Sequence, residues 1–259
     1  MKPNISEFSY GYALTDELIH WHGTTITAAP VFPSLYKEGK KGGGYDLLLD
    51  RGGIPLFLQF KLADCMVRSN AREVQQGHFA CPFFRMHLRP SRHSNQHEML
   101  LDLENQDNEV YYSAPAFHEL DDLNDAYLNH QVRQRSIWIK PSVIGPLPDD
   151  RDHHVAFQVP GPVVVCSEPR KIDGPADFET FTRAIEVAFQ QRRAHALTKE
   201  YLANLSKTLY SIGQRRKEIS PEQKDYARES VEPRHPLEQV AFFASMFFGL
   251  QLFIVAERE

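Results

Sequence analysis

Asp46, Gln59 and Lys61 are the residues of this chain whose types and spacing best suit chemistry on a phosphate. Two short apolar runs, 47–50 and 55–60, are separated by a pair of glycines, so the segment predicts a β-hairpin. If the hairpin folds about the glycine pair, Asp46 lies opposite Gln59, and cross-strand partners are about 4.5–5.5 Å apart at Cβ. Gln59 and Lys61 are two residues apart and share one face of their strand. A carboxylate, an amide oxygen and an ammonium group are therefore expected on one patch.

This pattern resembles the PD-(D/E)xK nuclease superfamily, in which an Asp on one strand is followed by Glu, Asp or Gln, any residue and Lys on the next. The resemblance covers roughly the first half of the chain, and the family's motif falls on Asp46, Gln59 and Lys61. Gln59 replaces the commoner glutamate and removes one negative charge from the expected metal site. The resemblance implies a restriction-endonuclease-like α/β fold, a mixed sheet flanked by helices.

The resemblance also implies a bound Mg²⁺ or Mn²⁺ ion, because these hard cations take oxygen ligands and retain water. The implied ligands are Asp46, the amide oxygen of Gln59, the carbonyl of Phe60 and an acid on the first helix. Glu7 and Glu17 are both candidates for that acid, and Glu7 is preferred. The catalytic residues implied are thus Asp46, Gln59, Lys61 and Glu7, with Lys61 orienting or deprotonating the attacking water or stabilising the transition state.

Composition excludes several other classes of protein. The chain has 259 residues and a net charge of −5, so any nucleic acid must be bound by a local basic patch. Arginines at 68, 72 and 85 are the candidates for phosphate contacts. The 3 cysteines form no disulfide framework, which indicates a reducing cytoplasm.

Hydrophobic periodicity predicts how the elements position these residues. A first helix is expected over 6–21 with Ser6 as its N-cap, and strands over 83–88, 109–116 and 136–139. A long amphipathic helix begins at Asp177. We therefore expect a nuclease-like α/β core over 1–170 and a helical C-terminal region over 171–259.

The apolar stretch 240–256 has 17 residues, slightly fewer than the roughly 20 that a membrane-spanning helix needs. It predicts a buried helix to about Phe248 and then a strand or second helix. A membrane-tethered effector is the alternative that this stretch leaves open. His93 and His97 have the spacing of a zinc pair on a helix, but no third ligand accompanies them and a structural role is favoured.

The sequence thus predicts a magnesium-dependent nuclease acting on DNA in preference to RNA, in host defence, mobile-element biology or repair. The alternative is an inactive nuclease-like fold that serves as a binding or assembly module. In that case the C-terminal helices carry the interface with a second copy or a partner protein.

Overall fold

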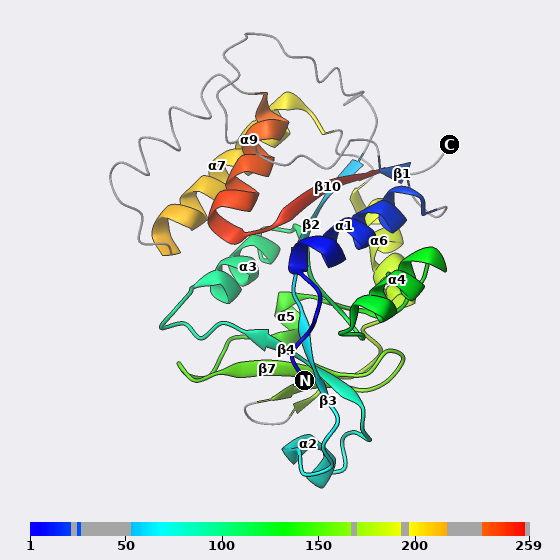
Figure 1. Ribbon diagram of the computed structural model, residues 1–259. Helices are drawn as coiled ribbons and strands as arrows, with labels where there is room; N and C mark the ends of the chain where they lie inside the picture. The colour runs from blue at the N-terminus through cyan, green and yellow to red at the C-terminus, as the bar shows by residue number, and fades with distance from the viewer. Residues whose placement is uncertain (22–24, 27–52, 167–169, 193–196, 217–234, 257–259) are drawn as a thin grey trace. The chain divides into compact units, whose positions relative to one another are not determined.

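A computed structural model describes residues 1–21, 25–26, 53–166, 170–192, 197–216 and 235–256 (Figure 1). It confirms the general class predicted from the sequence, α/β with a mixed sheet flanked by helices. Asp46 and the rest of the first hairpin strand lie outside the described residues, as does half of the expected turn.

The first of two five-stranded sheets has the strand order β1-β10-β2-β5-β6. β10 pairs antiparallel with β2, with Gln251 opposite Leu58 and Ala256 opposite Gly53. β5 is the other neighbour of β2. The sequence did not predict that β10, from the C-terminal part of the chain, would lie beside β2. The strand bounds are β1 Thr25–Ile26, β2 Gly53–Phe60, β5 Glu109–Pro115, β6 Ser136–Ile139 and β10 Gln251–Ala256.

The second sheet has the strand order β3-β4-β7-β8-β9, with every neighbouring pair antiparallel. Its polar face carries Asp64 opposite Arg85 and His87 opposite His154. Phe83 on the same face packs in an apolar cluster with Ala71 and Phe79. The strand bounds are β3 Ala63–Met66, β4 Phe83–Leu88, β7 His153–Phe157, β8 Val163–Cys166 and β9 Arg170–Lys171.

The helices follow local sequence signals. α1 begins after Ser6, whose hydroxyl oxygen accepts a hydrogen bond from the Ser9 N–H at 2.9 Å, as an N-cap does. The predicted apolar stripe of the helix after Asp177 is buried, but it is divided between α6 and α7. The helix bounds are α1 Glu7–Ile19, α2 Arg72–Gln75, α3 Gln96–Glu104, α4 Leu120–Leu128, α5 Pro141–Ile144, α6 Phe178–Arg192, α7 Lys199–Arg216 and α9 Pro236–Phe243.

The chain forms two compact units, each built from three separate segments. Unit 1 contains 1–22, 59–97 and 111–186, and unit 2 contains 23–58, 98–110 and 187–259. The sequence predicted a single boundary after residue 170. In unit 1, the hydroxyl of Tyr10 donates a hydrogen bond to Ser136 Oγ at 2.9 Å and lies 2.7 Å from Ser113 Oγ. These contacts connect α1 to β5 and β6.

The C-terminal apolar stretch folds as a helix followed by a strand, one of the two continuations predicted. α9 and a five-residue π-helix, Ala244–Phe248, are followed by β10. Within the part of the chain that the structure describes, no helix has the length and apolar character needed to cross a bilayer.

Candidate functional site

Gln59 and Lys61 lie together at the end of β2, where the backbone N–H of Lys61 donates to the carbonyl of Ser113 on β5 at 2.9 Å. Both side chains contact Gln96, the first residue of α3. The Gln96 Nε2 donates to Gln59 Oε1 at 2.7 Å, and Lys61 Nζ donates to Gln96 Oε1 at 2.9 Å. The side chains of Gln59 and Lys61 therefore lie on one side of the chain, as their spacing predicts.

The direction of these hydrogen bonds is fixed by Lys61. An ammonium group only donates, so Gln96 turns its oxygen to Lys61 and its NH₂ to Gln59. Gln59 then presents its oxygen to Gln96, and its own Nε2 donates to the carbonyl of Phe60 at 3.0 Å. Gln59 is 3% exposed, so it is held in this orientation inside the protein. Gln96 is a site residue that the sequence analysis missed.

Glu7 is the first-helix acid that approaches Lys61. Burial raises the pKa of Glu7, and the positive charges of Lys61 and Arg89 oppose that rise. Burial lowers the pKa of Lys61, while the carboxylate of Glu7 raises it and Arg89 lowers it. Glu7 is exposed at the surface of α1, so water reaches it from one side while protein groups crowd the other. Glu7, Lys61 and Arg89 thus form one electrostatically connected group.

Glu17, the other candidate acid, has a different place. It is 1% exposed, and its two carboxylate oxygens accept the backbone N–H groups of Val132 and Arg133 at 2.8 and 3.0 Å. These bonds anchor α1 to the segment that follows α4. Glu17 therefore has a structural role, and Glu7 remains the candidate for the first-helix acid.

The expected metal ligands fit a divalent cation only in part. The carboxylate of Glu7 is a suitable hard donor. The Gln59 and Phe60 oxygens already accept N–H groups, and an ion at Gln59 would meet the NH₂ of Gln96. Among the described residues no group of three His, Cys, Asp or Glu side chains is placed to hold a metal ion. Asp46, the remaining expected ligand, lies outside the described residues.

No family model, curated protein or solved structure matches this chain.

The predicted phosphate-binding arginines differ in their surroundings. Arg68 and Arg72 are exposed near α2. Arg85 pairs with the carboxylate of Glu73 through two hydrogen bonds, the one from Nε measuring 2.8 Å. Glu73 also accepts a hydrogen bond from Nε2 of His154 at 2.9 Å. The Glu73 carboxylate thereby neutralises much of the charge of Arg85. Arg68 and Arg72 are more accessible to a phosphate group than Arg85 is.

His97 is a core histidine. It is 2% exposed, with Nδ1 at 3.0 Å from the hydroxyl of Tyr112 and Nε2 at 2.8 Å from the carbonyl of Gly145. Both ring nitrogens are used in these contacts, which supports the structural role favoured for the His93–His97 spacing.

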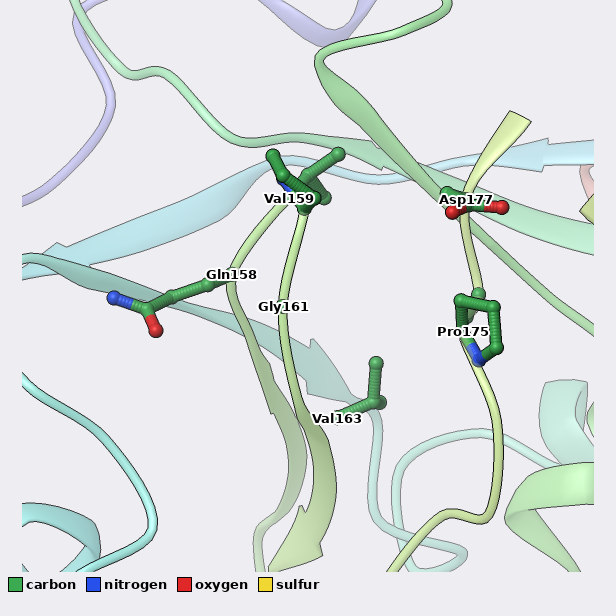
Figure 2. A pocket seen from close by; sticks show the side chains of 8 residues that line it. Gln158, Val159, Gly161, Val163, Pro175 and Asp177 are labelled. Atoms are coloured by element: carbon green, nitrogen blue, oxygen red, sulfur yellow. The ribbon is translucent and has the colours of Figure 1, made fainter. Parts of the chain in front are cut away.

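A shallow hollow lies in unit 1 away from these residues, between the end of β7 and the segment before α6 (Figure 2). Its polar side chains are already engaged. Gln158 donates to the carbonyls of Ala80 and Pro82, and Asp177 accepts the N–H of Thr180. The hollow therefore offers no chemistry comparable to that around Lys61.

Proposed function

We propose that this protein is a nuclease that hydrolyses phosphodiester bonds, in DNA in preference to RNA. The observation that carries the proposal is the half-buried Lys61 ammonium, which Gln96 and Gln59 hold at the end of β2 and on whose charge Glu7 acts. The resemblance to the PD-(D/E)xK superfamily implies an acid on the first helix and this lysine, and we extend the proposal to a restriction-endonuclease-like fold.

The chemistry follows from the opposed shifts of the two groups. Burial lowers the pKa of Lys61 and raises that of Glu7, so the two proton affinities approach each other and proton transfer between them costs less. A partly desolvated ammonium also stabilises the negative charge of a phosphoryl group more strongly than one in water does. Lys61 and Arg89 attract the phosphate, Gln96 orients the Lys61 ammonium, and Glu7 accepts or returns a proton.

In this proposal only carboxylates bind the magnesium ion. Glu7 and Asp46 would hold it, and when bound it would supply a polarised water and neutralise charge on the phosphate. Gln59 then acts by orienting Gln96 through the hydrogen bond between them, since its oxygen is already in use.

A binding or assembly module without catalysis is the second candidate, and the state of Gln59 favours it. Neutral Gln59 and the carbonyl of Phe60 are satisfied within the chain, as expected where a metal site has been lost. Metal binding separates the two functions, because an active site requires the ion and a decayed one does not retain it.

The test incubates the purified chain with single- and double-stranded DNA and with RNA, in Mg²⁺ or Mn²⁺. We expect cleavage that falls at least about 100-fold in Lys61→Met, Glu7→Gln and Asp46→Asn. Lys199→Met and Glu200→Gln, which alter exposed residues of α7, are the matched controls and retain the parent rate. Cleavage that survives in Lys61→Met excludes this site. If the parent protein cleaves none of these substrates and calorimetry detects no metal binding, the function as a binding module is favoured.

A further inference from the structure

The outer surface of α1 and α4 carries most of the exposed large apolar side chains of the described chain. Five of the nine belong to these two helices, which together contain 22 residues. They are Phe8 (76% exposed), Tyr12 (64%), Ile19 (41%), Leu120 (58%) and Leu128 (67%). Single exposed apolar residues are ordinary, but a concentration of this kind marks an interaction surface.

The two helices run side by side within unit 1, so these exposed residues belong to neighbouring elements. The backbone N–H of Asn4 donates to the carbonyl of His118 at 2.7 Å just before both helices begin. Near their ends, the hydroxyl of Tyr127 donates to Asp16 at 3.2 Å, and Glu17 accepts the N–H of Val132. Contacts at both ends place α1 parallel to α4 (Figure 1).

The exposed residues of α1 lie in a single line along the helix. Phe8, Tyr12 and Ile19 fall within about 40° of one another at 100° per residue. The opposite side of α1 is buried, with Tyr10 and Leu14 at 0% exposure. The stripe is therefore additional to the face that packs against the protein's own core.

The charged residues that the two helices contribute to this surface are all acidic, and Arg135 pairs with Asp122 and Asp125 of α4. The ranges of α1 and α4 contain six Asp or Glu residues and no Lys or Arg. Glu17 is buried, but Glu7 and Asp121 are exposed, and Asp125 keeps 63% exposure although it pairs with Arg135. A partner with Lys or Arg beside apolar side chains complements the exposed carboxylates of α4.

We propose that α1 and α4 together bind a basic amphipathic helix of a partner protein. The apolar face of that helix would cover Phe8, Tyr12 and Leu128, and its lysines or arginines would meet the carboxylates of α4. Aromatic anchors surrounded by charged groups of complementary sign are typical of helix recognition. This proposal does not depend on the activity proposed for Lys61.

The test measures binding of two fluorescein-labelled helical peptides of identical leucine pattern by anisotropy, one with lysine and one with glutamate on its polar face. We expect the lysine peptide to bind the full-length chain at least about 10-fold more tightly than the glutamate peptide. Phe8→Ala/Leu128→Ala should weaken the lysine peptide at least about 10-fold. Val143→Ala/Val187→Ala, which alters exposed apolar residues elsewhere, is the matched control and should bind as the parent does. Circular dichroism verifies that each variant is folded.

Three results overturn the proposal. The first is equal binding of the two peptides or no binding of the lysine peptide. The second is an equal loss in the control variant. The third is a different occupant, shown if Phe8→Ala/Leu128→Ala dissociates a dimer in sedimentation or abolishes binding of single-stranded DNA.

Discussion

At the scale of single residues, Lys61 is the centre of the site because each neighbour acts on its charge. Glu7 favours the ammonium form, whereas burial and Arg89 disfavour it. Gln96 accepts a hydrogen bond from it at 2.9 Å and transmits its orientation to Gln59. The chemistry proposed for Glu7 therefore depends on the presence of Lys61.

Lys61→Met should raise the pKa of Glu7 further above its ordinary value, because the variant removes a positive charge that lowers it. NMR titration of the Glu7 side-chain carboxyl measures this effect, with Lys199→Met as the control of equal chemistry. An unchanged or lowered pKa in Lys61→Met would show that the two groups are not coupled.

The candidate site was predictable where spacing determines geometry. Residues two apart on a strand share a face, which places Gln59 beside Lys61. An acid early in the first helix was foreseen from the family resemblance, and the structure brings Glu7 to Lys61. Gln96 lies 35 residues after Lys61 in another element, and no spacing rule connects the two. Its role follows from tertiary packing, as does that of Arg89.

At the scale of elements, α1 reaches Lys61 only because Gly11 allows it to approach β2 closely. A Cβ at position 11 would lie 2.7 Å from Cδ2 of the Phe60 ring. Tyr10 packs edge-on against the same ring, with centroids 6.0 Å apart. The first turn of α1, which carries Glu7, is thus positioned by this contact.

Gly11→Ala should lower the free energy of unfolding by about 1 kcal/mol. The gain in helix propensity is about 1 kcal/mol, and it is outweighed by an overpacking cost of about 1–3 kcal/mol. The variant should also shift the pKa of Glu7 as α1 moves. Gly213→Ala is the matched control, since its Cβ would meet the Phe247 ring in unit 2. That variant should lose stability in urea unfolding without moving the Glu7 titration. A Gly11→Ala protein with parental stability and titration would show that α1 does not depend on this approach.

Glu17→Gln should cost about 2 kcal/mol of stability. The buried carboxylate accepts two backbone N–H groups, whereas a glutamine side chain accepts one and leaves its NH₂ facing the other. Urea unfolding measures the loss, and Glu200→Gln on the exposed side of α7 should stay within about 0.5 kcal/mol of the parent. Equal stability of the two variants would mean that Glu17 does not anchor α1.

The elements themselves were largely predictable, and their partners were not. The strand 83–88 and the helix capped by Ser6 follow from local periodicity and capping chemistry. The strand after Gly249 was foreseen as one alternative, but its place beside β2 joins residues almost 200 positions apart. Such pairing depends on the complementarity of whole surfaces, for which the sequence carries no local signal.

At the scale of the whole molecule, we expect the stability of the fold against acid to depend on the polar face of the second sheet. Burial would raise the pKa of Glu73, but hydrogen bonds from Arg85 and His154 outweigh it and hold the value at about 2. Lys2 and His87 meet at Asp64 on the same sheet, where burial is likewise outweighed and the pKa of Asp64 is lowered. Burial lowers the pKa of His154, against the opposing effect of Glu73.

Arg85→Met should lower the stability near neutral pH and weaken its dependence on pH between about 4.5 and 2. Because the pKa of Glu73 is lower in the folded chain than the ordinary 4.5, the unfolded chain binds the additional proton as the pH falls. The stabilisation by Glu73 is thus complete above pH 4.5 and is lost as the pH falls toward 2. Removing Arg85 raises the folded pKa of Glu73, narrows that window, and leaves a buried carboxylate without its main partner, at a cost of about 3 kcal/mol near neutral pH.

Urea unfolding of the parent and of Arg85→Met between pH 3 and pH 7 measures both effects. Arg151→Met is the control, since Arg151 pairs with Asp149, whose pKa is also held at about 2, but the arginine side chain is 78% exposed. Water and salt screen an exposed pair, so this variant should follow the parent curve closely. If Arg85→Met and Arg151→Met change the stability at low pH equally, the lowered pKa of the buried Glu73 carboxyl does not determine how the stability of the fold depends on pH.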